Sequence, residues 1–199
     1  MTTAPTFWFD FVSPNAYLAH RMLPGVEART GVAFDYVPVL LGGLFKLTGN
    51  QPPMLVHANV ANKIAYEQRD LRRFVAKVGA TKFTFNSHFP LNTLNLMRTA
   101  AAAHLAGTLP TFVEAVFVAT WESGLKTDDM DVLAGVLGEA GLQADDLIAA
   151  GQTQEVKDHL MANTQDAADK GAFGVPSFRV NDELYFGKDR VEDVERALQ

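Results

Sequence analysis

Apolar residues near the start of the chain form a short run that is typical of a buried strand. Residues 6–12 read TFWFDFV, and Asp10 is the only charged residue in the run. A run this short and this rich in aromatic residues favours a strand over a helix. Ser13 and Pro14 follow directly, and a serine cap before a proline is a helix-start signature. The pattern predicts a strand that leads straight into a helix, which runs from Pro14 to about Thr30.

A second strand follows this helix. Pro24 predicts a kink or a restart within the helix, because proline removes a helical hydrogen bond and clashes with the preceding turn. Gly31 marks the helix end, and residues 33–39, AFDYVPV, predict a strand. A strand, a helix and a strand this close together indicate a right-handed βαβ unit with parallel strands.

From about residue 44 to residue 171 the apolar positions follow a helical period. Val60, Ile64, Leu71 and Phe74 recur at helical spacings. We expect helices over 60–78, 92–106, 110–123, 129–139 and 152–170. Tyr66 and Trp121 lie at helical spacing among core residues, and we expect both to serve packing.

Strand character returns near the end of the chain. Residues 177–186 contain SFRV and ELYF on either side of Asn181-Asp182, which predicts a tight β-hairpin. A last helix is predicted over 190–198, with Asp189 as its cap and Glu192 as the capping-box partner.

The elements occur in the order β-α-β, a long helical block, then β-β-α. This is an α/β fold with the order of a thioredoxin-like domain that carries a large all-helical insertion. We expect residues 1–43 plus 172–199 to form the thioredoxin-like domain and residues 44–171 to form the insertion. Two lobes would leave a cleft between them, where small-molecule sites usually lie.

Composition narrows the possible partners. The chain has 199 residues, 48% of them hydrophobic, and a formal net charge of −6. An acidic chain disfavours nucleic acid or an anionic membrane as partner. No apolar stretch approaches the ~20 residues that span a bilayer, and the first residues resemble no signal peptide. We therefore expect a cytoplasmic protein with no nucleic-acid or membrane partner.

The chain contains no cysteine. This excludes disulfides, thiolate metal sites, cysteine nucleophiles and dithiol redox chemistry. The five histidines have neither a metal-binding spacing nor an HExxH motif, so we expect no metal site.

Ser13 is the first candidate for chemistry. Its hydroxyl is expected at the positive end of a helix dipole, where an anion such as a thiolate is favoured. An ordinary N-cap is the alternative. A serine nucleophile is disfavoured because no base is near: His20 lies about two turns along the same helix, roughly 10 Å away.

Two later segments could bind a peptide-like ligand. Pro176 at the start of a strand is an edge device or a cis-proline turn, and a cis bond would free the Val175 N–H and C=O for such a ligand. Gly187 permits close approach, and Asp189 could receive an ammonium group, although ordinary capping explains Asp189 equally well. Glutathione is a ligand that has these features.

Polar residues in the helical block give further candidates. Lys46 follows a glycine pair, and Asn86 and Ser87 precede Pro90 in a segment that reads as a turn. A surface lysine and a plain turn are the simpler interpretations. All three residues could also lie at the edge of a cleft.

Three segments together resemble the 2-hydroxychromene-2-carboxylate isomerase family, which is related to kappa-class glutathione transferases. They are FDFVSPNAYLA, FGVPSF and YFGKDRVEDVERAL. The segments LLGGLFKLTGN and NSHFPLNT occur in the expected order between them, so the resemblance spans essentially the whole chain. It implies a thioredoxin-like fold with a helical insertion, glutathione as cofactor, and a homodimer.

The resemblance also implies roles for residues. Ser13 would donate a hydrogen bond to the glutathione sulfur, and Val175, before a cis Pro176, would pair with the cysteinyl backbone. The γ-glutamyl end would be held by the segment from Gly187 through Lys188 to Asp189. The second substrate, a small aromatic carboxylate, would face Lys46, Asn86 and Ser87.

Three functions remain open at this point. The first is glutathione-dependent isomerisation of a 2-hydroxychromene-2-carboxylate-like substrate through transient thiolate addition. The second is a kappa-like transferase or peroxidase, because LLGGLFK resembles the kappa pattern equally well. The third is a ligand-binding protein without catalysis. Lys188 departs from the small polar residue of relatives, and it could either add a charge near the γ-glutamyl carboxylate or point to water.

Overall fold

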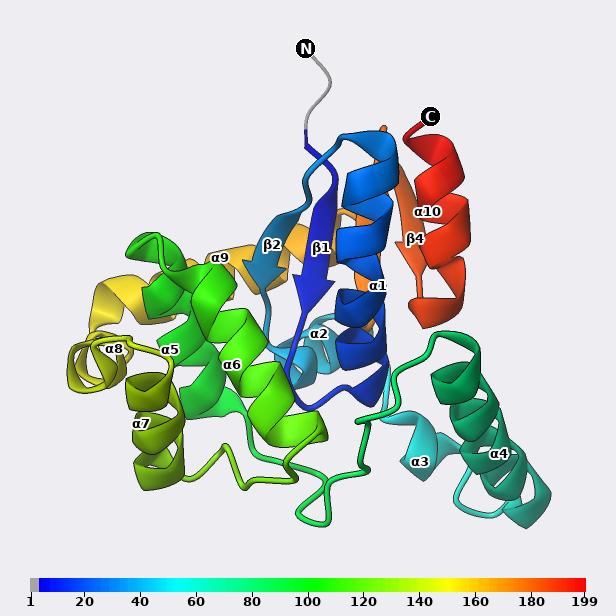
Figure 1. The fold of residues 1–199 in the computed structure, drawn as a ribbon, viewed down its shortest axis with the longest axis horizontal. Coiled ribbons are helices and arrows are strands. Elements are labelled where there is room, and N and C mark those ends of the chain that lie inside the picture. Colours follow the sequence, from blue (N-terminus) through cyan, green and yellow to red (C-terminus); the bar gives the residue numbers. More distant parts are fainter. Residues whose placement is uncertain (1–3) are drawn as a thin grey trace.

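A mixed four-stranded sheet forms the centre of the computed structural model, which describes residues 4–199; residues 1–3 of the predicted 1–43 segment lie outside the described residues. The strands lie in the order β2-β1-β3-β4 (Figure 1). Strand β1 pairs in parallel with β2, whereas β3 pairs antiparallel with both β1 and β4. Their bounds are β1 Thr6–Phe9, β2 Asp35–Pro38, β3 Ser177–Val180 and β4 Glu183–Phe186. The predicted βαβ unit and hairpin are confirmed.

Helix α1, Pro14–Thr30, connects the two parallel strands. It runs through Pro24 without interruption. Of the predicted kink or restart, the restart is therefore wrong, and the kink stays a prediction. Leu23 and Val26 on either side of the proline are buried in the core, and this packing offsets the missing hydrogen bond. Gly31 ends the helix with φ 72°, as predicted.

The middle of the chain is helical, as predicted, but it contains three short helices that periodicity did not indicate: α2, α3 and α8. In Figure 1, α5 to α8 gather beside β2, whereas α3 and α4 lie below α10, Val191–Ala197. The predicted boundary between residues 43 and 44 lies within α2, and the division into two lobes stays a prediction. The bounds are α2 Leu41–Thr48, α3 Pro53–Val56, α4 Ala61–Lys77, α5 Leu94–Leu105, α6 Leu109–Trp121, α7 Met130–Glu139, α8 Ala144–Ala150 and α9 Gln154–Asp169.

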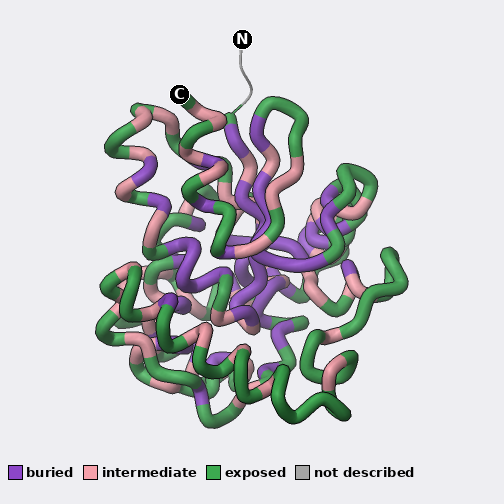
Figure 2. Tube along the Cα trace, turned by 90° about the vertical axis from the view of Figure 1, so that its right-hand side faces the viewer, coloured by how far each residue is buried: buried purple, intermediate pink, exposed green. Residues whose placement is uncertain are grey.

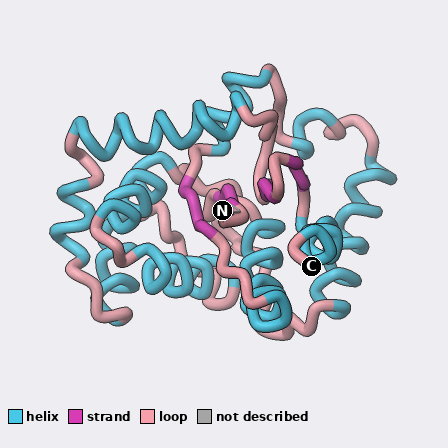
Figure 3. Tube along the Cα trace, turned by 90° about the horizontal axis from the view of Figure 1, so that it is seen from above, coloured by secondary structure: helices cyan, strands magenta, loops and turns pink. Residues whose placement is uncertain are grey.

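Both faces of the sheet are covered by helices, which is visible from above (Figure 3). Phe7 and Phe9 of β1 belong to the larger core cluster, together with α1, α5 and α6. Trp8 points to the opposite face, where it packs near Leu44 of α2 and Ala167 of α9. This alternation follows the two-residue period of a strand, and the buried positions concentrate in the interior of the molecule (Figure 2).

Two aromatic residues predicted to serve packing have different environments. Trp121 is buried, and its Nε1 donates to the Phe11 carbonyl at 2.9 Å. Tyr66 is 53% exposed, so its predicted packing role is wrong. Phe74 is the residue of α4 that is buried.

The chain end differs from the predicted capping box. The hairpin turn forms as predicted, with positive φ at Asn181 and Asp182. The residues after it form a 3-10 turn, η1 Lys188–Arg190, before α10 Val191–Ala197, and neither has a side-chain cap. Asp189 pairs with the Lys188 ammonium, and Glu192 pairs with Lys77 of α4. Competing ion pairs therefore replace the capping box.

A polar cluster joins α1 to α6. Glu114 of α6 accepts from both Arg21 and His20 of α1, at distances of 2.7–3.1 Å. The hydrogen bond from His20, together with the Arg21 charge, lowers the pKa of Glu114 to about 2, against an opposing effect of burial.

Within residues 4–199, none of the helices has the length and apolar character that crossing a membrane requires.

Candidate functional site

Ser13 lies in the turn between β1 and α1. Its backbone N–H donates to the Asp10 carbonyl at 3.1 Å, and its Oγ accepts from Ala16 N at 3.2 Å. It is thus the N-cap of α1, with Pro14 at the first helical position. The side chain lies at the positive end of a long helix, and it is 7% exposed.

The fold brings Ser13 against the segment before β3. The Ser13 Oγ donates to the Val175 carbonyl at 3.3 Å, across 162 positions of sequence, and the Val175-Pro176 bond is cis. A distance of 3.3 Å is long for a hydroxyl donor, for which about 2.7–2.8 Å is usual. Because Ala16 N occupies the acceptor side, rotation about the Cβ–Oγ bond could redirect the hydroxyl proton to a nearby anion without breaking the cap.

The segment beside Ser13 offers a free backbone donor. Ser177 Oγ donates to the Gly174 carbonyl at 2.8 Å, which fixes the turn before β3. Among residues 4–199 the Val175 N–H has no acceptor. A backbone N–H next to a strand is the group with which an extended peptide ligand pairs.

A catalytic base for Ser13 is missing from its surroundings within the described chain. His20, the histidine on the same helix, has both ring nitrogens engaged: Nδ1 lies 2.9 Å from the Tyr36 hydroxyl and Nε2 lies 3.0 Å from Glu114 Oε2. A general base must reach its proton directly or through one water. The arrangement therefore suits Ser13 as a hydrogen-bond donor and not as a nucleophile.

Asp10, which is completely buried, connects the Ser13 turn to the helical insertion. One carboxylate oxygen accepts from Val12 N at 3.0 Å, and the other accepts from Leu41 N at 2.9 Å and Thr93 Oγ1 at 3.1 Å. Burial raises the pKa of Asp10, although these hydrogen bonds favour the charged form. Asp10 was not among the predicted site residues; its isolation as one charge in an apolar run was the available signal.

The predicted γ-glutamyl segment follows β4 and lies beside the same loop. Gly187 N donates to the Pro176 carbonyl at 2.9 Å, and Gly187 has a φ of 103°, which favours glycine. The Asp189 side chain is 54% exposed, whereas that of Lys188 is 7% exposed. Two hydrogen bonds, Ser13 to Val175 and Gly187 to Pro176, thus connect the start of α1 to this segment through the Val175-Pro176 peptide. Of the two alternatives for Lys188, the burial of its side chain excludes the one in which it points to water.

Lys46 lies in the last turn of α2 and is exposed. Leu41, the first residue of α2, is bonded to Asp10, so the helix that carries Lys46 is tied to the Ser13 turn. Within residues 4–199, Lys46 has no hydrogen bond or ion pair with another predicted site residue.

Asn86 is buried, and its amide is fully engaged. Nδ2 donates to the carbonyls of Thr120 and Leu125 at 2.9 and 2.8 Å, and Oδ1 accepts from His88 N at 2.8 Å. These bonds hold the loop that carries Ser87, which is exposed. Asn86 thus has a structural role in this arrangement.

Two hollows were not predicted from the sequence. A hollow of about 430 Å³ lies between α4 and residues 83–85; its lining includes Leu71, Phe83, Phe85 and Arg72. Phe83 stacks on Tyr17 of α1, with ring centroids 5.8 Å apart. This hollow therefore adjoins the first turns of the helix that Ser13 begins.

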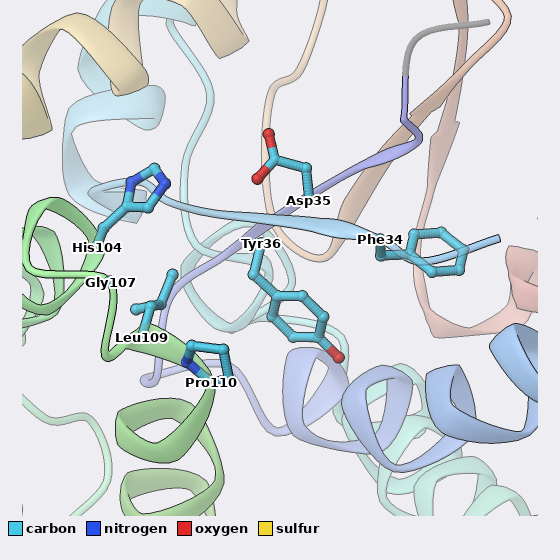
Figure 4. Close-up of a pocket in the computed structure, with 7 residues that line it drawn as sticks. All are labelled: Phe34, Asp35, Tyr36, His104, Gly107, Leu109 and Pro110. Carbon is cyan, nitrogen blue, oxygen red and sulfur yellow. The ribbon is translucent and has the colours of Figure 1, made fainter.

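The other hollow, of about 200 Å³, lies at the opposite end of the sheet (Figure 4). Asp35 and Tyr36 of β2 point to opposite sides of the strand there, and His104 faces the hollow from α5. Asp35 pairs with Thr6, the first residue of β1. Ser13, in contrast, follows the last residue of β1, so the two lie at opposite ends of this strand. None of the predicted site residues lines this hollow.

Comparison with known proteins shows the family to which this sequence is similar. Residues 6–199 match the family model of the DSBA-like thioredoxin domain. A 2-hydroxychromene-2-carboxylate isomerase from Sphingobium xenophagum is 33% identical, over 100% of this chain and 99% of the relative. A glutathione S-transferase kappa 1 from Rattus norvegicus is 28% identical, over 93% of this chain and 86% of the relative.

The solved structure of a 2-hydroxychromene-2-carboxylate isomerase superposes on this chain with a TM-score of 0.85 at 24% identity. The superposition covers 98% of this chain and 94% of the isomerase chain. The chain belongs to the DSBA-like thioredoxin-domain family, in the group of 2-hydroxychromene-2-carboxylate isomerases and kappa-class glutathione transferases. The predicted thioredoxin-like fold and the predicted family are both confirmed.

Proposed function

We propose that the chain is a glutathione-dependent isomerase of 2-hydroxychromene-2-carboxylate-like substrates. The contact between the Ser13 hydroxyl and the Val175 carbonyl carries this proposal, because it joins a helix N-terminus to a free peptide donor in a chain without cysteine. The isomerase relatives support the reaction class. We further propose a cytoplasmic homodimer that acts on a small aromatic carboxylate.

The residues present fit glutathione as a cofactor. Ser13 has a weakly engaged hydroxyl for the sulfur, and the Val175 N–H is available for the cysteinyl carbonyl. The exposed Asp189 carboxylate suits the γ-glutamyl ammonium, and Gly187 and Pro176 hold that corner against the Val175 loop. The cysteinyl part and the γ-glutamyl ammonium of the ligand would therefore each meet a group of matching charge or polarity.

When bound, glutathione would supply the thiolate that adds to the substrate and leaves unchanged. The Ser13 hydroxyl would donate to the sulfur, and the N-terminus of α1 would add its partial positive charge. Both effects stabilise the charged form of a thiol and so lower its pKa. The thiol proton would be released to solvent water, so no side chain of the protein needs to accept it.

The isomerase proposal predicts turnover without consumption of glutathione. Purified protein with catalytic glutathione should change the absorbance spectrum of 2-hydroxychromene-2-carboxylate, and the total free thiol should stay constant, because the thiol is released after each turnover. An unchanged spectrum would rule out the isomerase. Loss of free thiol in the presence of an electrophile would instead support the second candidate, a kappa-like transferase or peroxidase, which the kappa relatives favour. If the protein binds a ligand but neither changes the spectrum nor consumes thiol, the third candidate, a non-catalytic binding protein, is supported.

A cation near the site would favour binding of a carboxylate substrate, and Lys46 and Arg72 are candidates outside the proposed glutathione segment. Lys46 is exposed on α2, and Arg72 lines the apolar hollow formed with Phe83 and Phe85. We propose that Lys46, with Ser87 in the loop held by Asn86, faces the substrate, and that the hollow receives its aromatic part.

Matched Lys46→Gln and Arg72→Gln variants test which cation serves the substrate. Loss of a charge-assisted hydrogen bond costs about 1.5–3 kcal/mol, so KM for the carboxylate substrate should rise about tenfold or more in the Lys46 variant. The Kd for glutathione should stay unchanged in both variants. If KM rises only in the Arg72 variant, the assignment of Lys46 is wrong.

A further inference from the structure

Lys188 is a buried cation at the edge of the proposed glutathione site. Its side chain is 7% exposed, and lysine is rarely buried without a partner. Nζ donates to both carboxylate oxygens of Asp189, at 2.9 and 3.1 Å, and lies 4.3 Å from the centroid of the Phe74 ring. The ammonium is therefore fixed between an anion and the face of an aromatic ring.

Several contacts hold this ammonium beside the predicted ligand segment. Gly187, which precedes Lys188, is bonded to Pro176 at 2.9 Å. Phe74 belongs to α4, and α4 is joined to the same corner by the ion pair of Lys77 with Glu192 at 2.7 Å. The position of the charge is thus set from both the hairpin side and the α4 side.

The ion pair of Lys188 with Asp189 has one buried and one exposed side chain. Lys188 contacts Asp189 from the buried side, while the Asp189 side chain remains 54% exposed. A carboxylate has about four acceptor positions, so Asp189 can accept from Lys188 and from a ligand ammonium together. The neighbouring positive charge weakens the attraction of Asp189 for an ammonium and strengthens the attraction of the corner for a carboxylate.

We propose that Lys188 is a specificity-determining residue of the glutathione site, which makes binding depend on the α-carboxylate of the γ-glutamyl group. This inference rests on the proposed use of glutathione. The α-amino acid end of that group carries both charges, so its ammonium meets Asp189 and its carboxylate meets the field of Lys188. The corner then selects a zwitterionic end group over one that carries only an ammonium.

Calorimetric titration of three ligands tests the preference. The ligands are glutathione, an analogue without the α-carboxylate and an analogue without the α-amino group. Lys188→Met keeps an unbranched apolar side chain over Phe74 and removes the charge. We expect the variant to bind glutathione and the deaminated analogue about tenfold more weakly, which is ~1.4 kcal/mol. The affinity for the decarboxylated analogue should be unchanged or higher.

Arg190→Met is the matched control, because it removes a cation two positions after Lys188 whose side chain is 56% exposed. It should change each affinity by less than about twofold, as expected for a solvated surface charge. Equal weakening of all three ligands in Lys188→Met would show that Lys188 only supports the corner, and it would overturn the inference. If the unaltered protein binds none of the three ligands, the proposed function itself fails.

Discussion

Replacement of Ser13 by alanine should lower kcat/KM for glutathione-dependent turnover by about 10- to 100-fold. The hydroxyl is the donor proposed for the sulfur, and a hydrogen bond to a charged group is worth about 1.5–3 kcal/mol. Alanine also lacks the oxygen that accepts from Ala16 N, so about 1 kcal/mol of stability should be lost with the cap. Steady-state kinetics at saturating glutathione, together with thermal unfolding, measure the two effects separately.

Thr153→Ala provides the matched control for the cap. Thr153 is the exposed N-cap of α9, and its hydroxyl accepts from Val156 N at 3.4 Å. This variant should lose a similar amount of stability and keep its full kcat/KM. If Ser13→Ala also keeps its full kcat/KM, Ser13 is an ordinary cap and has no catalytic role.

Replacement of Asp10 by alanine should destabilise the protein by about 3 kcal/mol. The substitution leaves three donors without an acceptor, namely the buried Thr93 hydroxyl and the half-buried Val12 N and Leu41 N. Each lost partner costs about 1–3 kcal/mol, and relief of the buried charge returns part of the total. Denaturant unfolding measures the change.

Thr93→Val removes one of the three donors together with its need for a partner, so it should cost about 1 kcal/mol or less. The two variants together separate the role of the carboxylate from the role of a single contact. An unchanged unfolding midpoint in Asp10→Ala would contradict the assignment of Asp10 as the link between the Ser13 turn and α2.

Local patterns predicted the elements that a short segment determines by itself. The Ser13-Pro14 start of α1 and the Asn181-Asp182 turn depend on neighbouring residues, and both form as predicted. The restart at Pro24 failed because burial on both sides of the proline outweighs its local cost. Tertiary packing kept the helix continuous, and the local sequence around Pro24 does not show that packing.

Helix α2 shows why short helices were missed. Gly42 and Gly43 disfavour a helix locally. A side chain at position 43 would meet Thr164 Cγ2 at 3.0 Å, so glycine permits the close approach of α2 to α9. The helix is fixed by the burial of Leu44 and by the bond from Leu41 N to Asp10, contacts that join distant parts of the chain.

The site was predictable in its residue types but not in its connections. Ser13 and Val175 were each chosen from local motifs, and the fold brings them into contact. The role of Asp10 and the burial of Lys188 depend on Thr93 and Phe74, which lie about 80 and 110 positions away in the chain. Long-range contacts of this kind are visible only in the folded structure.

The ionisation of bound glutathione tests the central claim most directly. Thiolate absorbance should be followed against pH for glutathione bound to the unaltered protein and to Ser13→Ala. A free thiol has a pKa of about 8.5. We predict a midpoint well below that value in the unaltered protein and a return toward it in the variant. Absence of binding, or the same midpoint for bound and free glutathione, would contradict the proposal that Ser13 and the start of α1 hold a thiolate.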